Sequence, residues 1–297
     1  MNGNMKGKVC LITGANSGIG KQTAVELASL GASVVMVCRN RLRGTVAQTE
    51  IMWQSGSNKL EVLVADLSSL SSVRRFSEKF LARYDRLDVL VNNAGIAVWN
   101  LSKSVDGIEL TFATNYLGHF LLTNLLLGIL KESSPSRIVN MSSVVHNMAP
   151  EIDFMHLKIL EGLPPLQAYA QSKLANLMFT YELARRLDGT GVTVNAVDPW
   201  LARTNLASQV TGYLKALRWV LMNILGTSVE KGTRTVVYLA SSPRVDGISG
   251  KYFRNSRPIR SSKVSYDTEK WLELWNITEE LIKVRDKEPI EELAGII

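Results

Sequence analysis

The sequence predicts an α/β fold, a doubly wound parallel sheet of about seven strands with helices on both faces. Short runs rich in β-branched residues alternate with longer stretches of helical periodicity, which is typical of repeated β-α-β units. Several of the strand-like runs are apolar throughout, as expected of strands covered on both faces. No internal repeat or Pro/Gly/Ser-rich linker interrupts the pattern, so we expect a single domain over residues 1–297.

The expected elements follow one another along the whole chain. Strands are predicted at Val9–Thr13, Ser33–Cys38, Leu60–Val64, Val89–Asn92, Ile138–Met141, Val192–Val197 and Lys251–Phe253. Helices are predicted at residues 18–30, 41–55, 71–84, 108–131, 166–187, 228–241 and 266–284.

Two long connections and the end of the chain complete this plan. The connection 146–165 is rich in proline, and the connection 199–227 includes an amphipathic stretch from Tyr213 to Leu225. Long insertions near strand ends often serve as lids or binding loops, so we expect 199–227 to be the substrate loop. The alternative for the 213–225 stretch is a helix that packs on the core. The last predicted helix, over about 265–285, is a C-terminal extension.

The apolar stretches and the cysteines indicate a reducing compartment. Residues 120–130 form the longest apolar run, which is well short of the roughly 20 residues that span a bilayer. The chain reaches its first strand too early for a signal peptide. Cys10 and Cys38 lie inside apolar runs and are expected to be reduced. We expect a cytoplasmic protein, with peripheral membrane contact left open.

The charge pattern argues against a nucleic-acid partner. The formal net charge is +7, but Lys and Arg are scattered, with no run of five or more. His119, His146 and His156 lack the spacing of metal ligands and have no cysteine neighbours, so we assign no metal and expect ordinary packed or surface histidines.

A glycine-rich turn follows the first strand. Its residues are Thr13, Gly14, Ala15, Asn16, Ser17, Gly18, Ile19 and Gly20, and a helix opens directly after them. Glycines allow the backbone to approach a pyrophosphate, whose charge is met by free N–H groups at a helix N-terminus. A tight strand-to-helix connection is the alternative, but the position at a strand–helix junction favours nucleotide binding.

The end of the second strand favours NADP(H) over NAD(H). About 20 residues after such glycines, NAD sites place an acid on the adenosine ribose. This chain instead has Cys38, Arg39 and Asn40 there, so a guanidinium can pair with a 2′-phosphate, and Arg43 could also reach it. The alternative is a solvated arginine at a strand end.

Tyr169 and Lys173 form the candidate catalytic centre. They are four residues apart and therefore share one helix face. A phenol titrates near pH 10 unless a positive charge stabilises its anion, and Lys173 could supply that charge. Alone, the pair would usually be an ordinary surface pair.

Further polar residues are expected at the same edge of the sheet, where open α/β sheets bind ligands. They are Asn92, Asn93, Ala94 and Gly95 after the fourth strand, Asn115 in the long helix, and Ser142 and Ser143 after the fifth strand. Each has an ordinary structural role as an alternative: a turn, a helical polar residue and a cap.

These motifs occur in the order of the classical short-chain dehydrogenase/reductase family, which the chain resembles over about residues 6–255. The shared motifs are TGANSGIG, Asp66-Leu67, NNAG, Asn115 in NYLGH, Ser142-Ser143 and YAQSK. The segments CRN, NYLGHFLLT, RIVNMSS and QSKLANLMFTYELARRL are most similar to the retinol-dehydrogenase-like branch. The resemblance implies a Rossmann-type fold and hydride transfer between a nicotinamide and a carbonyl or alcohol carbon.

The resemblance also implies roles for individual residues. Tyr169 would be the acid/base that protonates the substrate oxygen, and Ser143 would hydrogen-bond the same oxygen. Lys173 would hold the nicotinamide ribose and lower the pKa of Tyr169. Asn115 would anchor a water that links Lys173 to bulk solvent.

The implied cofactor contacts are distributed over the same edge. Asp66 and Leu67 would flank the adenine, Asn92 and Ala94 the adenosine side, and Thr204 the carboxamide. The full set is Gly14, Asn16, Ser17, Gly18, Ile19, Gly20, Arg39, Asp66, Leu67, Asn92, Ala94, Gly95, Tyr169, Lys173, Pro199 and Thr204.

Two positions depart from the family pattern. Trp200 follows Pro199 where the family commonly has glycine, and it cannot adopt glycine's backbone conformations cheaply. The interval from Ser143 to Tyr169 is longer than usual, which leaves open whether Ser142 or Ser143 contacts the substrate.

Two functions compete. The first is an NADP(H)-dependent oxidoreductase acting on a lipophilic carbonyl or alcohol, retinoid-, steroid- or fatty-aldehyde-like, with Trp200 and the 213–225 stretch forming an apolar lid. The second is a non-enzymatic NADP(H)-binding protein that recognises a partner. The complete Asn-Ser-Tyr-Lys set favours the enzyme. Related enzymes often pair through helices that correspond to 108–131 and 166–187, so a homo-oligomer is a further hypothesis.

Overall fold

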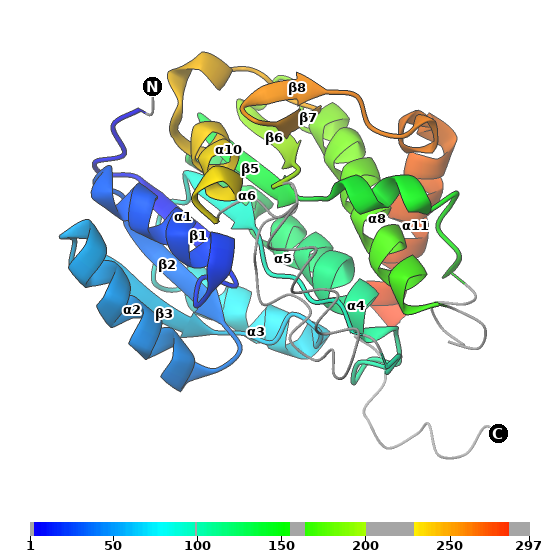
Figure 1. Cartoon of the computed structure of the whole chain (residues 1–297), viewed down its shortest axis with the longest axis horizontal. Helices are drawn as coiled ribbons and strands as arrows, with labels where there is room; N and C mark the ends of the chain where they lie inside the picture. Colours follow the sequence, from blue (N-terminus) through cyan, green and yellow to red (C-terminus); the bar gives the residue numbers. More distant parts are fainter. Residues whose placement is uncertain (1–2, 99, 155–163, 200–228, 285–297) are drawn as a thin grey trace, which may run out of the picture.

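One sheet forms the centre of the protein. The computed structural model describes residues 3–98, 100–154, 164–199 and 229–284. The strands are β1 (Val9–Thr13), β2 (Ser33–Cys38), β3 (Leu60–Val64), β4 (Val89–Asn92), β5 (Ser136–Met141), β6 (Val192–Val197), β7 (Lys251–Arg254) and β8 (Arg257–Ile259). Their order in space is β3-β2-β1-β4-β5-β6-β7-β8, and neighbouring strands run parallel except for the antiparallel pair β7–β8 (Figure 1).

The helices agree with the sequence prediction except in one region. They are α1 (Gly18–Ser29), α2 (Arg41–Ser55), α3 (Leu70–Leu81), α4 (Leu110–Phe112), α5 (Gly118–Leu125), α6 (Leu127–Glu132), α8 (Pro165–Arg186), α10 (Val229–Ser241) and α11 (Thr268–Val284). Shorter turns are the π-helix η1 (Ala113–Leu117) and the 3₁₀ helices η2 (Val144–Met148), η4 (Pro243–Val245) and η5 (Lys263–Tyr266). Among the described helices, none is long and apolar enough to cross a membrane.

The region predicted as one helix over about 108–131 is helical from Leu110 to Glu132 apart from Leu126, but it is not one regular α-helix. This region is divided into α4, η1, α5 and α6. The wide turn η1 and Leu126, whose backbone angles (φ −100°, ψ 3°) leave the α-helical region, interrupt the regular helix, and the prediction from apolar spacing marked neither of them.

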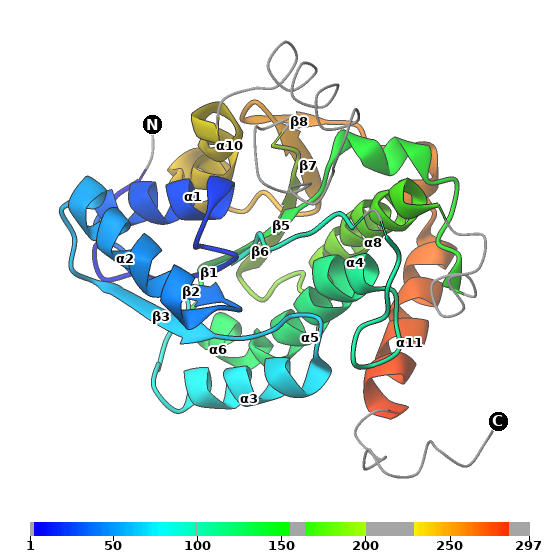
Figure 2. The same ribbon diagram turned by 60° about the horizontal axis from the view of Figure 1, so that its bottom comes forward.

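Side chains along the strands alternate between two apolar cores. Val9 and Leu11 of β1 belong to the core that contains α3, α5 and α8, whereas Cys10 and Ile12 belong to the core that contains α1, α2 and α10. Figure 2 shows α1, α2 and α10 on one side of the sheet and α3, α5 and α6 on the other. Because successive side chains of a strand point to opposite faces, a strand buried on both faces is expected to be apolar, as β1 is from Val9 to Ile12.

The strand order reverses between β1 and β4. β1 pairs with β2 on one side and with β4 on the other, so the connections leave in opposite directions at this point. In open α/β sheets the crevice at the carboxyl ends of such strands binds the ligand. The sheet therefore places its ligand site where β1, β4 and β5 end.

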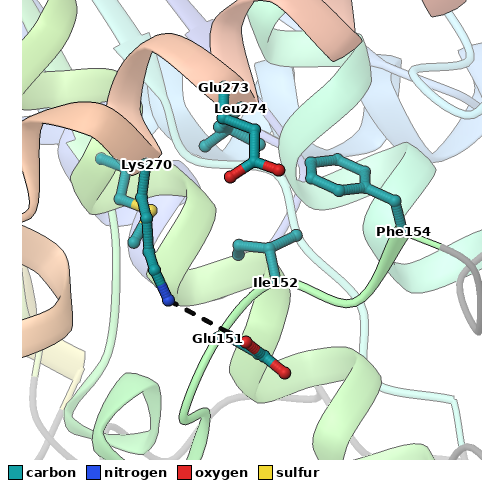
Figure 3. Close-up of a pocket in the computed structure, with 7 residues that line it drawn as sticks. Glu151, Ile152, Phe154, Lys270, Glu273 and Leu274 are labelled. Atoms are coloured by element: carbon teal, nitrogen blue, oxygen red, sulfur yellow. Dashed lines mark ion pairs between the residues drawn. The ribbon is translucent and has the colours of Figure 1, made fainter.

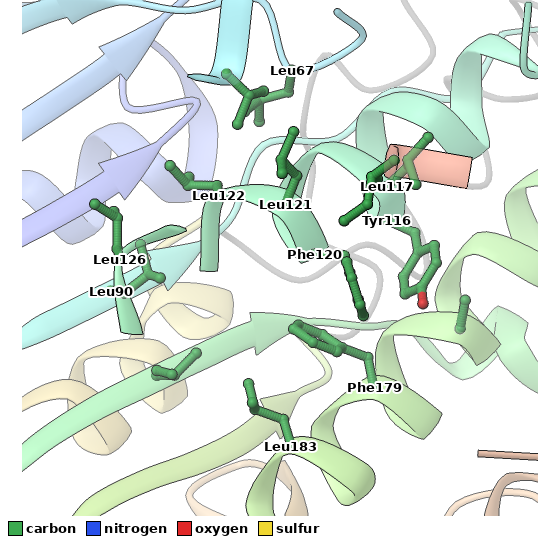
Figure 4. Packing of buried hydrophobic residues seen from close by; sticks show 14 of the residues in the cluster. Leu67, Leu90, Tyr116, Leu117, Phe120, Leu121, Leu122, Leu126, Phe179 and Leu183 are labelled. Atoms are coloured by element: carbon green, nitrogen blue, oxygen red, sulfur yellow. The ribbon is translucent and has the colours of Figure 1, made fainter. Parts of the chain in front are cut away.

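Helix α11 packs on the outer side of α5 and α8. The ring centroid of Trp275 lies 4.8 Å from that of Phe120 and 5.9 Å from that of Phe179. The hydroxyl of Tyr116 is 2.8 Å from that of Thr278. Figure 4 shows Tyr116, Phe120 and Phe179 in this part of the core. The C-terminal extension predicted at about 265–285 is thus an integral layer of the core.

Candidate active site

The glycine-rich turn after β1 approaches the segment after β4 very closely. A Cβ atom on Gly14 would lie 2.9 Å from the Ala94 Cα atom, and one on Gly20 would lie 2.3 Å from the Asn93 Nδ2 atom. Gly14 and Gly18 also have φ values of 66° and 54°, which are unfavourable for residues with a side chain. Glycine is therefore needed here both for the turn and for the contact.

The N-terminus of α1 is open toward this edge of the sheet. Ser17 precedes the helix, and its side chain makes no capping hydrogen bond with the described residues. The first amide groups of a helix lack partners within the helix and favour an anion. The turn and the helix end therefore have the features that a pyrophosphate site needs.

Thr13 connects the two segments through its hydroxyl. Its Oγ1 atom accepts hydrogen bonds from the amides of Asn93 and Ala94 at 2.8 and 2.9 Å and lies 2.8 Å from His119 Nε2. The Nδ1 atom of His119 is 2.9 Å from the Asn115 carbonyl oxygen, so Nδ1 carries the hydrogen and Thr13 donates to Nε2. Burial lowers the pKa of His119 to about 4, which keeps it neutral.

His119 was predicted only as an ordinary histidine. Its partner Thr13 is 106 positions away, and nothing local in the sequence marks their contact.

Asn115 lies in the π-turn η1 and holds the segment after Gly95. Its Oδ1 atom accepts from the Ile96 amide at 2.8 Å, and its Nδ2 atom donates to the Ile96 carbonyl at 2.9 Å and to Ser172 Oγ at 3.1 Å. The Asn115 carbonyl accepts from Asn176 Nδ2 at 3.2 Å and from His119. π-turns often occur at functional sites, and this one joins the turn after β4 to α8.

Tyr169 and Lys173 lie one turn apart on α8. The Lys173 Nζ atom is 5.5 Å from the centre of the Tyr169 ring and donates to the Met141 carbonyl oxygen at 3.3 Å. Only 4% of Lys173 is exposed. Burial lowers its pKa to about 8, although the Asp198 carboxylate acts in the opposite direction.

The phenol of Tyr169 is protonated at neutral pH. Burial raises its pKa, a hydrogen bond with Ser143 acts against this rise, and the Asp198 carboxylate adds to it. The pKa of Tyr169 is therefore raised, and the lowering by Lys173 that the resemblance implies is not found in this structure. A protonated phenol is the form that can donate a proton to a substrate oxygen.

Ser142 and Ser143 have different environments. Ser142 is buried, and its hydroxyl donates to the Lys173 carbonyl at 2.9 Å. Ser143 is partly exposed, accepts from the Val145 amide at 3.3 Å and shares a hydrogen bond with Tyr169. Ser143 is thus the serine that lies beside the phenol.

The predicted adenosine contacts lie at the ends of β2, β3 and β4. Arg39 is exposed after β2. Asp66 accepts from the Ser68 amide and hydroxyl at 3.0 and 2.7 Å. The Asn92 side chain points into the protein, where its Nδ2 atom donates to Asn140 at 2.8 Å, so only its backbone can contact a ligand at the edge.

A partly buried ion pair lies at the end of β6. Arg254 donates from Nε and Nη2 to the Asp198 Oδ2 atom at 3.0 and 2.7 Å, and Pro199 follows directly. Nothing in the sequence pattern indicates that Asp198 and Arg254 meet. Trp200, Thr204 and the rest of the substrate loop lie outside the described residues.

A small surface pocket lies apart from this site (Figure 3). Its volume is about 90 Å³, and it contains none of the predicted catalytic or cofactor-binding residues. Its walls are Glu151, Ile152, Phe154, Met178, Lys270, Glu273 and Leu274. Among the described residues, no cluster of His, Cys, Asp and Glu side chains could hold a metal ion.

The chain is similar to several named proteins. A family model described as short chain dehydrogenase matches residues 8–213. Human retinol dehydrogenase 14 is 44% identical over 298 residues, which cover 94% of this chain and 88% of that protein. Bovine retinol dehydrogenase 12 is 43% identical over 279 residues, which cover 94% and 87%.

Solved structures share the fold. An uncharacterized protein from Mycobacterium paratuberculosis is 35% identical, with a TM-score of 0.77 and coverage of 95% of this chain and 96% of that one. A 3-ketoacyl-(acyl-carrier-protein) reductase from Brucella melitensis, complexed with NADH, is 26% identical, with a TM-score of 0.64 and coverage of 84% and 96%. A short chain dehydrogenase from Shigella flexneri, complexed with NADP, is 21% identical, with a TM-score of 0.66 and coverage of 86% and 100%.

Proposed function

This chain belongs to the short-chain dehydrogenase family, and we propose that it is an NADP(H)-dependent enzyme that reduces or forms a carbonyl group on a lipophilic substrate. The predicted likeness to the retinol-dehydrogenase-like branch is confirmed by the matches to retinol dehydrogenases. The chain is therefore an oxidoreductase of this family, and its substrate and its choice of cofactor are the proposal.

The meeting of Ser143, Tyr169 and Lys173 supports the proposal most directly. In the reducing direction, the Tyr169 hydroxyl donates its proton to the substrate oxygen, and the Ser143 hydroxyl donates a hydrogen bond to the same oxygen. The nicotinamide supplies the hydride when it is bound. Lys173, charged below pH about 8, holds the nicotinamide ribose and favours the phenolate that forms when the proton leaves.

We propose that the relay water lies beside Gly95. A Cβ atom on Gly95 would lie 3.4 Å from Asn115 Oδ1 and 3.7 Å from Lys173 Nζ, so glycine leaves space that both polar atoms border. The Asn115 carbonyl already accepts from His119 and Asn176. We therefore propose that Asn115 holds the water through Oδ1.

The choice of cofactor depends on this chain's own residues, because solved members of the fold contain NADP or NADH. Arg39 is exposed where a 2′-phosphate would lie, and Asn40 caps α2 beside it by accepting from the Arg43 amide at 3.0 Å. Cys38 is buried, and a Cβ atom on Gly44 would lie 2.4 Å from its sulfur atom. Because Asn40 caps a helix and Cys38 is packed inside the protein, Arg39 is the residue of this segment to test.

Arg39→Ala is expected to weaken NADPH binding by roughly ten- to a hundredfold. One charge-assisted pair contributes about 1.5–3 kcal/mol to the binding free energy, which corresponds to this loss of affinity. NADH binding should not change, because NADH has no 2′-phosphate. Both affinities are measured by fluorescence titration at fixed ionic strength. Lys59→Ala, which removes an exposed cation just before β3, is the control. Equal wild-type affinities for the two cofactors would refute the NADP(H) assignment.

Turnover distinguishes the enzyme from a non-enzymatic cofactor-binding protein. NADPH oxidation is measured with retinal, a steroid ketone and a long-chain aldehyde, and NADP⁺ reduction with the matching alcohols. We expect turnover with at least one apolar substrate. Tight NADPH binding without turnover on any member of the panel would favour the binding protein.

A further inference from the structure

His146 is buried beside the proposed catalytic residues and makes two hydrogen bonds through its ring. It lies in η2, and only 1% of it is exposed. Its Nδ1 atom is 2.6 Å from the Ser143 carbonyl oxygen, and its Nε2 atom is 3.0 Å from the Ser262 amide nitrogen. Ser262 precedes η5, so the ring joins the backbone of Ser143 to the segment that leads into α11.

The two partners determine the protonation state of this ring. A carbonyl oxygen only accepts, so Nδ1 carries the hydrogen, and an amide only donates, so Nε2 is unprotonated. The backbone amide of His146 also donates to the Ser143 carbonyl, at 3.0 Å. Only the neutral imidazole satisfies Ser143 and Ser262 together.

The carbonyl of Ser143 is coupled to the direction of its hydroxyl. Ser143 has extended backbone angles (φ −164°, ψ 153°), and its Oγ atom accepts from the Val145 amide at 3.3 Å. The hydroxyl hydrogen is thereby directed away from the helix, where it can serve Tyr169 or a substrate oxygen. A shift of the turn that His146 holds would move the Val145 amide and change the hydrogen bond that this amide donates to the Ser143 hydroxyl.

We propose that His146 is a positioning residue that aims the Ser143 hydroxyl and ties it to the segment before α11. The inference rests on the proposed function, because it assigns His146 a part in the carbonyl chemistry at Ser143. His146 would not touch the substrate and would act only through Ser143. Misplacement of a reacting group by about 1 Å can lower a rate by roughly a hundredfold, so such a residue can have a large effect.

The surroundings of the ring give its influence a pH dependence. The edge of the ring packs against Tyr252 with centroids 5.5 Å apart and planes at 89°. Burial lowers the pKa of His146 below its ordinary value of 6.5; the Asp198 carboxylate acts against this and the Arg254 guanidinium with it. Protonation would place a hydrogen on Nε2 against the Ser262 N–H group. Activity should therefore fall as the pH drops through the pKa of His146, below 6.5.

Two substitutions at His146 test the proposal. His146→Phe keeps a flat ring against Tyr252 but removes both hydrogen bonds, and we expect kcat to fall roughly ten- to a hundredfold with an unchanged dissociation constant for NADPH. His146→Asn offers one donor and one acceptor and does not titrate. We expect it to restore much of the kcat and to lack the loss of activity below pH 6.5 that the wild type shows.

A matched pair at Ser262 tests the other end of the bridge. Ser262 has a φ of −61°, which suits proline, so Ser262→Pro removes the amide donor without a change of backbone angle. Ser262→Ala removes the hydroxyl and keeps the donor. We expect kcat to fall in Ser262→Pro and to stay at the wild-type value in Ser262→Ala, with thermal unfolding measured for all four variants.

The outcomes separate the two proposals. If the wild type turns over a carbonyl substrate and folded His146→Phe has the same kcat, the inference is wrong and the proposed function stands. An acid limb retained in His146→Asn, or equal kcat in the two Ser262 variants, also overturns it. A wild type that binds NADPH but turns over no substrate overturns the proposed function and this inference with it.

Discussion

Tyr169→Phe is expected to lower kcat on the order of a thousandfold and to leave the affinity for NADPH unchanged. The ring still packs on α8 between Lys173 and Ser143, so the cofactor site keeps its shape. The proton that the substrate oxygen needs is gone. Steady-state rates with the best substrate of the panel, together with NADPH titration, give both quantities.

Tyr84→Phe is the matched control. It removes a phenol hydroxyl from the end of α3, where Tyr84 donates to Glu61 far from the site, and should leave kcat unchanged. Near-wild-type turnover in Tyr169→Phe would show that another group donates the proton and would remove the basis of the proposed mechanism.

Lys173→Met is expected to lower kcat/KM on the order of a hundredfold and to weaken NADPH binding. The wild-type ammonium is present below its pKa of about 8 and lost above it, so the wild-type kcat/KM should fall as the pH rises through 8. The variant should lack this alkaline limb. Lys59→Met is the control for a lysine outside the site, and an alkaline limb that persists in Lys173→Met would assign it to another group.

The same substitution should stabilise the fold. The pKa of Lys173 is lowered from 10.5 to about 8, so the unfolded chain binds the proton more tightly between these values. The buried ammonium therefore costs stability below pH 8, and this cost disappears as the pH rises toward 10.5. Denaturant unfolding should show Lys173→Met more stable than the wild type at pH 7, with the difference shrinking above pH 8.

Local patterns predicted much of the fold correctly. The seven predicted strands are present because an apolar run bounded by turns leaves few alternatives. Gly14 and Gly20 are specific because no side chain fits their close contacts with Ala94 and Asn93. Strand β8 was missed because it is three residues long and contains Pro258, which a strand pattern normally excludes.

Contacts between distant segments could not be predicted. The roles of His119 and His146 depend on Thr13 and Ser262, which are 106 and 116 positions away, and the sequence describes each histidine only as an isolated residue. The choice between Ser142 and Ser143 was open for the same reason. Neighbours on a strand end point in opposite directions, and only the position of α8 shows which of them is buried.

Helix α11 covers the outer face of α5 and α8, and this covering does not depend on protein concentration. The Arg186 guanidinium lies 4.0 Å from the Trp275 ring, so α8 holds α11 by a cation–π contact as well as by the aromatic contacts at Phe120 and Phe179. A second copy that paired through this covered face would have to displace α11. Because α11 is tethered to the same chain, its effective concentration is independent of dilution, whereas a partner subunit would dissociate by mass action. This part of the core therefore stays covered at any protein concentration.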